Sequence, residues 1–427
     1  MMKKPEILAP AGSMEKLKFA LRFGADAVYL GGSDFSLRAQ GKNFGQAELT
    51  EAVHYVHEQG KKVYVTVNIY PHEDDLAGLA DYLRFLESVG ADAALVSDLG
   101  IFTLARQVAP KLPLHVSTQA NTLNSAAVNA WAAMGAERVV LGREVSLEEL
   151  KKIRAATNVE LEMFVHGAMC VSYSGRCLLS NFLTGRDANR GSCTQPCRWK
   201  YALVEEKRPG QYFPVEEDAR GTYIFNSKDL ALLSYVGQLS ELGVDSLKIE
   251  GRMKSVHYAA TVANTYRRAV DDYFDWRSES AVLDCGAVTN IGEWAPAQSM
   301  YDELEKISHR RYSLGFLEGR PDMNGQVYNT SVYEQSTEFI GVVLSCDEDG
   351  NAVIEQRNNF RVGENIEFFP PEGEIFSFVP EKMADGDNND IQVAPHARQI
   401  VKMKLPKQVP DYTILRRILV ENKEDHK

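Results

Sequence analysis

One phrase recurs along the first half of this chain and limits the folds open to it. Helix-like segments end at a glycine in four places, and a short apolar run follows each one. These runs are Gly24-Ala-Asp-Ala-Val-Tyr-Leu-Gly, Gly90-Ala-Asp-Ala-Ala-Leu-Val-Ser, Gly135-Ala-Glu-Arg-Val-Val-Leu-Gly and Gly243-Val-Asp-Ser-Leu-Lys-Ile-Glu. Glycine ends a helix in the left-handed conformation, and a buried strand then follows. Helices that alternate with such strands build a parallel sheet covered by helices.

Eight such strands are predicted, and most are separated by connections long enough for a helix. They are Ile7–Pro10, Ala27–Gly31, Val63–Ile69, Ala93–Ser97, Leu114–Thr118, Arg138–Leu141, Glu160–Val165 and Ser246–Ile249. Apolar residues between them recur at helical spacing, as at Leu76, Leu79, Leu83 and Leu86. The pattern therefore predicts an α/β fold, a (β/α)8 barrel of the TIM type that closes after a helix near Val256–Asp272.

The alternation is interrupted once and then ends, which predicts the domain organisation. Residues 1–283 would form the barrel, with a cysteine-rich insertion after strand seven at about 168–230. That connection emerges on the C-terminal face, where barrel enzymes carry their active sites. Residues 284–335 form a predicted bridging segment with a helix around Ala297–Ile307, and alternating runs from 336 to 427 predict a small C-terminal all-β, barrel-like domain. The acidic stretch 381–390 is expected to be a loop.

Four of the six cysteines lie in the insertion, with the spacing C-x6-C-x15-C-x3-C: Cys170, Cys177, Cys193 and Cys197. Clustered cysteines in a chain with few others indicate a metal or iron–sulfur site. Four thiolates from one long insertion are able to wrap an iron–sulfur cluster, whereas a structural zinc usually uses two closely spaced pairs. Only Cys193 and Cys197 have such spacing, so zinc remains open as an alternative.

Charge and hydropathy exclude some classes of partner. The net charge of −12 argues against wholesale electrostatic wrapping of nucleic acid, and DNA is not expected as a partner. The stretch from Cys170 to Lys200 is a local exception, because Asp187 alone opposes five cations there: Arg176, Arg186, Arg190, Arg198 and Lys200. This basic stretch fits either an anionic substrate or a loop that offsets thiolate charge. No apolar run approaches the roughly 18 residues that cross a bilayer, so we expect a cytoplasmic protein without a membrane partner.

Polar residues near the predicted strand ends supply further candidates. Glu162 and His166 flank the predicted end of strand seven, and a histidine there is suited to donate a proton or to contact substrate. Lys248, Glu250 and Arg252 alternate at strand eight and are expected to point the same way, as a structural network or as an anion-binding group. Glu162, His166, Lys248 and Glu250 are the predicted catalytic residues. The predicted substrate-binding residues are Arg176, Arg186, Arg190, Arg198, Arg252, Gln119, Asn226 and Lys228, with Asn121, Arg143, Glu144 and Asp229 as weaker candidates.

Several motifs in one order carry a family resemblance. They are Glu162-Met-Phe-Val-His166-Gly-Ala-Met-Cys170 with Ser174-Gly-Arg-Cys177, LAPAGS (8–13), GADAVYLGG (24–32), NSKDL (226–230) and KIEGRMKS (248–255). In these motifs the chain resembles the U32 family, historically labelled collagenase-like peptidases, and within it the branch involved in tRNA hydroxylation.

The resemblance implies a function, a cofactor and partners. It implies formation of 5-hydroxyuridine at wobble position 34 of tRNA, with a [4Fe–4S] cluster on the four cysteines and prephenate as a co-substrate linked to the hydroxyl supply. The implied partners are tRNA, through its anticodon loop, and a paralogous family member in a complex. Two alternatives stay open: a U32-type peptidase, and a non-catalytic RNA-binding subunit of a hydroxylase complex. The sequence contains neither HExxH nor GxSxG, which weakens the peptidase alternative.

Overall fold

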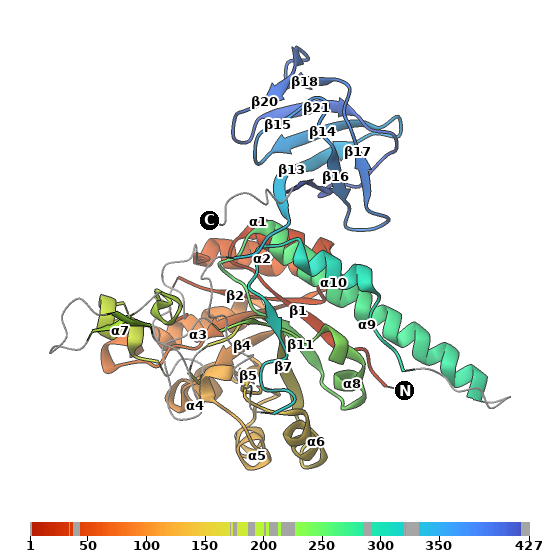
Figure 1. Ribbon diagram of the computed structural model, residues 1–427. Helices are drawn as coiled ribbons and strands as arrows, with labels where there is room; N and C mark the ends of the chain where they lie inside the picture. Colours follow the sequence, from red (N-terminus) through yellow and green to blue (C-terminus); the bar gives the residue numbers. More distant parts are fainter. Residues whose placement is uncertain are drawn as a thin grey trace.

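Two lobes make up the computed structural model, a helix-covered barrel below and a β domain above it (Figure 1). It describes residues 2–33, 35–36, 43–170, 172–173, 177–186, 193–199, 202–204, 212–214, 227–284, 293–319, 321 and 333–419. None of the helices in these ranges is both long and apolar enough to span a membrane.

Eight parallel strands form the barrel: β1 (Glu6–Pro10), β2 (Ala27–Gly31), β3 (Lys62–Val67), β4 (Ala93–Val96), β5 (Leu114–Val116), β6 (Arg138–Val140), β7 (Glu160–Ala168) and β11 (Ser246–Ile249). Each strand pairs with the next, and β11 closes the barrel by pairing with β1 on one side and β7 on the other. The predicted (β/α)8 barrel and all eight of its strands are confirmed.

Helices cover the outside of the barrel: α1 (Met14–Arg22), α2 (Gln46–Glu58), α3 (Leu79–Val89), α4 (Leu99–Val108), α5 (Ser125–Ala133), α6 (Leu147–Ala155), α8 (Val236–Glu241) and α9 (Val256–Asp284). Short 3-10 turns lie at η1 (Glu73–Leu76), η2 (Thr118–Ala120) and η5 (Leu233–Tyr235). Gly24, Gly90, Gly135 and Gly243 all have positive φ, as the repeated phrase predicts. Two predictions are wrong: α9 runs twelve residues beyond Asp272, and Leu76 lies in η1, where it is exposed.

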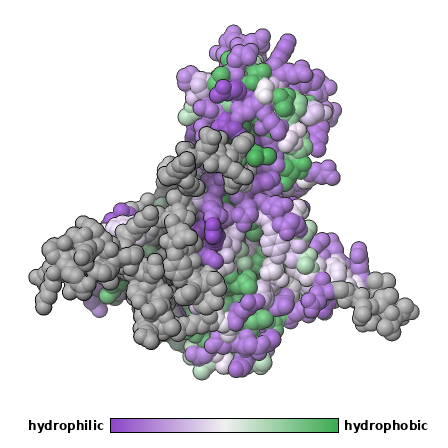
Figure 2. Space-filling model, viewed as in Figure 1, coloured by the Kyte–Doolittle hydropathy of each residue, from purple (hydrophilic) through white to green (hydrophobic). Residues whose placement is uncertain are grey.

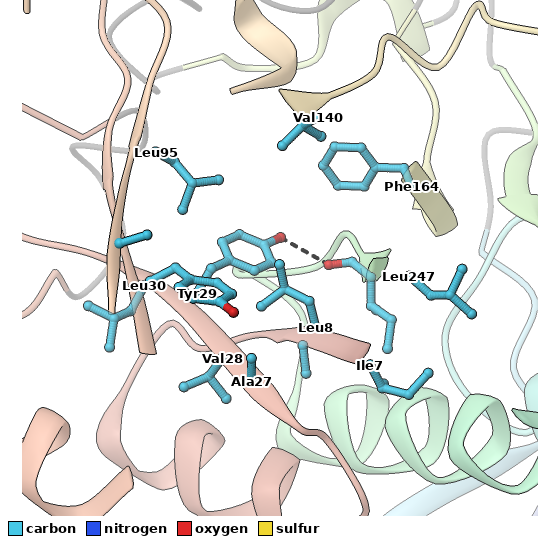
Figure 3. Packing of buried hydrophobic residues seen from close by; sticks show 14 of the residues in the cluster. Ile7, Leu8, Ala27, Val28, Tyr29, Leu30, Leu95, Val140, Phe164 and Leu247 are labelled. Carbon is cyan, nitrogen blue, oxygen red and sulfur yellow. Dashed lines mark hydrogen bonds between the residues drawn. The ribbon is translucent and has the colours of Figure 1, made fainter. Parts of the chain in front are cut away.

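Side chains along the barrel strands alternate between the barrel interior and the surrounding helices. Leu8, Tyr29 and Phe164 converge at the centre together with Leu95 and Val140, whereas Ile7, Val28 and Leu247 point toward the surrounding helices (Figure 3). Successive side chains of a strand point to opposite faces, and the parallel strands are buried on both faces, which explains their nearly continuous apolar sequence.

The cysteine insertion contains short elements that start beside β7. These are α7 (Leu179–Thr184), η4 (Pro196–Arg198), the strand pair β8 (Ala202–Val204) and β9 (Tyr212–Pro214), and β10 (Asp229–Ala231). β10 pairs antiparallel with the end of β7, and β12 (Tyr312–Ser313) from the bridging segment pairs with β10. The bridging segment also contains α10 (Gln298–Glu305). The end of β7 is therefore extended into a small sheet outside the barrel.

The C-terminal domain is all-β, as predicted. Its strands are β13 (Thr337–Cys346), β14 (Asn351–Gln356), β15 (Phe360–Arg361), β16 (Ile366–Phe369), β17 (Phe376–Phe378), β18 (Met383–Asp385), β19 (Asp390–Ile391), β20 (Val393–Ala394), β21 (Ile400–Lys404) and β22 (Ile414–Ile418). The acidic stretch 381–390 contains the hairpin β18–β19 and is not only a loop, because Asp385 accepts hydrogen bonds from the turn amides of Asp387 and Asn389. Hydrophilic residues cover most of the face of this lobe seen in Figure 2.

The two lobes share a buried contact. Phe19 and Phe23 of α1 pack with Val342, Phe369 and Ile414 of the β domain, beside the start of α9. Beside this contact Arg416 is fully buried between two carboxylates, with its guanidinium nitrogens 2.6 Å from Glu303 and 2.6 Å from Glu367. An apolar contact with buried ion pairs fixes the β domain against the barrel.

Candidate functional site

The four cysteines lie in the segment that leaves the end of β7. None of the four forms a disulfide; Cys170 and Cys193 are exposed, and Cys177 and Cys197 are half-buried. The backbone N–H of Leu179 donates to Cys177 Sγ at 3.4 Å, and that of Gln195 donates to Cys193 Sγ at 3.3 Å. Such N–H···S bonds stabilise thiolate ligands and tune iron–sulfur clusters.

Two hydroxyl side chains hold the halves of this segment together. Ser180, in the first turn of α7, accepts from the backbone N–H of Thr194 at 3.0 Å, and the two hydroxyls lie 3.1 Å apart. This contact brings the stretch after Cys177 next to the stretch after Cys193. The long gap between the second and third cysteines is therefore closed in space.

The thiol positions bear on which metal the segment would hold. In the described part of the chain, one set of three or more His, Cys, Asp or Glu residues has ligand atoms within 4.8 Å of one another. That set contains none of these cysteines. Sulfurs bound to one zinc at about 2.3 Å lie about 3.8 Å from one another. Sulfurs that hold a four-iron cluster lie further apart, because each binds a different iron. Thiolates are ligands in both kinds of centre, so the four-iron cluster on these cysteines stays a prediction.

Two of the predicted catalytic residues lie inside the barrel below its mouth. Lys248 Nζ is 2.6 Å from Glu162 Oε1, and Arg138 bridges Glu162 at 3.1 Å and Glu6 at 2.7 Å. Burial alone raises the pKa of Glu162, but Lys248 and Arg138 outweigh it and lower that pKa, so the carboxylate is ionised. The expectation that Glu162 flanks the end of strand seven is wrong, since β7 continues for six more residues.

His166 faces away from the barrel interior. The register of β7 against β11 shifts at Ile249, which pairs with His166, and this bulge turns the imidazole toward α9. There it lies among the rings of Tyr258, Tyr266 and Tyr312 with 1% of its surface exposed. Burial lowers the pKa of His166 to about 3, so the ring is neutral. The predicted position beside the mouth is wrong, because the residue lies within β7 and behind it.

The remaining predicted residues of strand eight separate from one another. Glu250 lies at the mouth, 3.7 Å from Arg143 and 3.4 Å from the Tyr29 hydroxyl. Arg252 is buried and donates to Ser36 at 3.1 Å and Thr66 at 3.2 Å. The prediction that Lys248, Glu250 and Arg252 share one face fails beyond Ile249, where β11 ends and alternation no longer applies.

Other candidates from the sequence are dispersed. Gln119 and Asn121 follow β5, and each has a buried side-chain oxygen with no hydrogen-bond partner among the described residues. Lys228 is half-buried beside Asp229, whose carboxylate accepts from the backbone of Arg310 at 3.2 Å. Arg186 follows α7 and is half-buried. Arg176, Arg190 and Asn226 lie outside the described residues, as does the side chain of Arg198 in η4.

A cavity of about 750 Å³ connects the barrel mouth with the cysteine segment. Its lining residues are Glu144, Ser146, Glu149, Cys170, Ser172, Tyr173, Phe316 and Gly319. One oxygen of Glu144 is buried with no hydrogen-bond partner in the described part of the chain, and burial raises the pKa of this carboxyl group. The cavity thus combines two carboxyl groups, two aromatic rings and the first cysteine.

Sequence reasoning missed the contribution of the bridging segment to this region. Phe316 lines the cavity, Tyr312 packs on His166, and Arg310 lies 3.8 Å from Asp229. The run HRRYSLGF was visible in the sequence, but its pairing with β10 through β12 depends on tertiary contacts.

Comparison with known proteins places the chain in a family. The sequence pattern of peptidase family U32 matches residues 12–326, and that of the peptidase family U32 C-terminal domain matches residues 335–416. The chain belongs to peptidase family U32. The motifs that suggested this family run from residue 8 to residue 255, and all but the first four residues of LAPAGS lie within the matched range.

Individual relatives carry more specific names. "tRNA hydroxylation protein P1" of Bacillus subtilis (strain 168) is 41% identical over 420 residues, which cover 97% of this chain and 95% of that protein. "tRNA hydroxylation protein P" of Escherichia coli (strain K12) is 36% identical over 459 residues, covering 97% of each. A 23S rRNA 5-hydroxycytidine synthase of Escherichia coli (strain K12) is 35% identical over 315 residues, 74% of this chain and 45% of that protein. These U32 relatives are thus named for the hydroxylation of RNA and not for proteolysis.

Proposed function

We propose that this protein is an RNA-modifying hydroxylase that acts on tRNA. The observation that carries the proposal is the similarity along almost the whole chain to two proteins named for tRNA hydroxylation. The position of Cys170 in the lining of a cavity at the barrel mouth supports it, because barrel enzymes react their substrates at this end. A tRNA substrate also fits the predicted cytoplasmic location.

The finer proposal concerns the product and the cofactor. We propose 5-hydroxyuridine at the wobble position as the product, as the sequence resemblance implies. We also propose prephenate as a co-substrate linked to the supply of the hydroxyl group. Cys170, Cys177, Cys193 and Cys197 would hold a [4Fe–4S] cluster, which supplies one-electron chemistry when bound. A paralogous family member as a complex partner remains a prediction.

Residues of the cavity would position the pyrimidine base next to Cys170. A base extruded from an anticodon loop is commonly held between aromatic rings, and Tyr173 and Phe316 offer such rings here. Burial raises the pKa of the Glu144 carboxyl group, whose oxygens would accept a hydrogen bond from N3–H of uracil. Arg143, stacked 3.9 Å from the centre of the Phe164 ring, and Glu250 border the mouth and would orient a small anionic co-substrate.

Nucleoside mass spectrometry of tRNA tests the activity. A strain that lacks this gene and its paralogues should lose 5-hydroxyuridine-derived wobble nucleosides, and the wild-type gene should restore them. Cys177→Ala should fail to restore them and should lose iron and sulfide from the anaerobically purified protein. Cys346→Ala is the control, since this half-buried thiol lies in the β domain. Unchanged nucleosides in the deletion strain would contradict the proposal.

Substitution of Glu144 tests the base-binding cavity in the same assay. Glu144→Gln keeps an acceptor oxygen at the same place and should keep most of the activity, whereas Glu144→Ala should reduce it at least about tenfold, since one lost hydrogen bond to a base is worth roughly 1–3 kcal/mol. Glu148→Gln, an exposed neighbour paired with Lys151, should leave activity unchanged. Equal activity of Glu144→Ala and wild type would remove Glu144 from the proposed site.

A further inference from the structure

Three side chains converge where α10 meets the segment that leads into β13, away from the cysteines. Glu305 is the last residue of α10, His309 follows four residues later, and Glu334 lies beside them. One ligand atom of each lies within 4.8 Å of the others. The backbones of His309 and Glu334 exchange two hydrogen bonds, of 3.0 and 2.8 Å, as an isolated antiparallel bridge. Backbone contacts therefore fix two of the three positions.

The imidazole of His309 is held in one tautomer. Its side chain is 1% exposed, and Nδ1 lies 2.8 Å from the carbonyl oxygen of Arg310. A carbonyl only accepts, so Nδ1 carries a hydrogen, and in the neutral ring Nε2 therefore presents its lone pair. Nε2 lies 3.0 Å from Glu305 Oε2, yet this contact lacks the direction of a hydrogen bond, and Nε2 has no hydrogen-bond partner among the described residues.

A positive charge between three acceptor atoms that converge in this way would stabilise them. Ligand atoms about 2.1 Å from one metal ion lie about 3.0–3.4 Å apart, which matches the distance between His309 Nε2 and Glu305 Oε2. A histidine that donates its other nitrogen to a carbonyl is the usual arrangement around a bound metal. Glu305 also stands at the C-terminal end of a helix, where the helix dipole disfavours a carboxylate and favours a cation.

A proton on His309 is the competing source of positive charge. Burial lowers the pKa of His309, but the carboxylate of Glu305 and the Arg310 carbonyl outweigh burial and raise it. Arg311 also donates to Glu334 Oε1 at 3.0 Å, which leaves the second oxygen of Glu334 for another cation. The side chains of Glu305 and Glu334 are 55% and 44% exposed, so an ion and its water ligands have access from solvent.

We propose that Glu305, His309 and Glu334 bind a divalent first-row transition-metal ion, with water in the remaining positions. An imidazole beside two carboxylates favours ions such as Mn²⁺, Fe²⁺ or Zn²⁺ over Mg²⁺ and Ca²⁺. The ion would tie the end of α10 to the entry of β13, where Ser336 donates to Glu305 O at 3.1 Å and Thr337 to Lys306 O at 2.8 Å. The ion would brace the junction between the barrel and the β domain. This metal site does not depend on the proposed hydroxylation.

Titration of the full chain with Mn²⁺ tests the site, because Mn²⁺ prefers oxygen and imidazole ligands to the thiolates of the cysteine segment. Electron paramagnetic resonance should count one bound Mn²⁺ per chain, with echo modulation from a directly bound imidazole nitrogen. Glu305→Gln and Glu334→Gln should each weaken binding at least about tenfold, since each replaces a charged ligand by an amide of equal size. Asp302→Asn is the control on the same helix, and it should bind as wild type does.

Three results would overturn the inference. They are the absence of stoichiometric Mn²⁺, equal affinity in wild type and both glutamine variants, and bound Mn²⁺ without nitrogen coupling. A protonated His309 in nitrogen NMR spectra of a chain that binds no Mn²⁺ would assign the group to an ion pair. Measurement of tRNA hydroxylation with the same preparations separates this outcome from failure of the proposed function.

Discussion

At the scale of single residues, the buried carboxylate of Glu162 stabilises the barrel through its ion pairs. Glu162 has no exposed surface and holds both Lys248 and Arg138, and Arg138 also contacts Glu6 and Glu160. Removal of one member of a buried ion network leaves an uncompensated charge in the interior. Glu162→Gln should therefore lower the free energy of unfolding by about 3–5 kcal/mol, measured by urea denaturation at neutral pH.

Glu160→Gln is the matched control for this prediction. Glu160 also contacts Arg138, at 2.7 Å, but its side chain is 40% exposed, so solvent screens the pair. We expect a loss of at most about 1 kcal/mol. Equal losses for the two variants would show that the interior network does not depend on Glu162.

Glu162 and His166, both in β7, show how much of a site the sequence predicts. Alternation correctly groups Glu162 with inward-facing Phe164, but it extrapolates to His166 without the bulge that turns this ring outward. That bulge arises from the pairing of β7 with β11, more than 80 residues away in the chain. Residue types at strand ends are thus readable from sequence, whereas side-chain direction depends on distant register.

At the scale of single elements, the end of β7 depends on one glycine. Gly167 has φ +111°, and a Cβ there would lie 2.6 Å from the carbonyl oxygen of Glu250. Gly167→Ala should lower the free energy of unfolding by about 1–3 kcal/mol because of backbone strain. The same strain should displace Cys170, three residues later. Urea denaturation together with iron analysis of the anaerobically purified protein measures both effects.

Gly185→Ala separates general glycine strain from the effect on β7. Gly185 follows α7 with φ +68° and open space around it, so its replacement should cost about 1 kcal/mol and leave the iron content unchanged. The same loss of iron in both variants would argue that the geometry of β7 does not set the position of the cysteines.

Elements with a local signal are the ones that sequence predicts well. Helix-ending glycines and buried runs identify all eight barrel strands, because each signal lies within about ten residues. Leu76 continues the apolar spacing of α3, yet Gly78 in the left-handed conformation starts that helix later. The pairing of β10 with β12 joins segments about 80 residues apart, and no local pattern indicates it.

At the scale of the whole molecule, three buried histidines predict sensitivity to acid. Burial lowers the pKa of His115, His166 and His257 to about 3 each, whereas an unfolded histidine has a pKa of about 6.5. The unfolded chain therefore binds more protons between these values, so stability is complete above about pH 6.5 and falls as the pH drops. His166→Gln should reduce the slope of unfolding free energy against pH by up to about 1.4 kcal/mol per pH unit. Urea denaturation from about pH 7 to pH 5 measures the slope, and an unchanged slope would contradict a neutral His166.

The contact between the lobes should make the molecule unfold as one unit. Phe369 is 2% exposed, lies 5.0 Å from the ring of Phe23, and supports the guanidinium of Arg416 at 4.4 Å. Phe369→Ala should lower the free energy of unfolding by about 3–5 kcal/mol, because it leaves a cavity at the interface. It should also divide the single calorimetric transition into two, since the ion pairs alone then join the lobes.

Val379→Ala is the control, at a position 46% exposed in the same domain. It should change the free energy of unfolding by less than about 0.5 kcal/mol and keep one transition. Two transitions already present in the wild-type protein would show that the lobes are energetically independent, and the position of the β domain would then owe little to this interface.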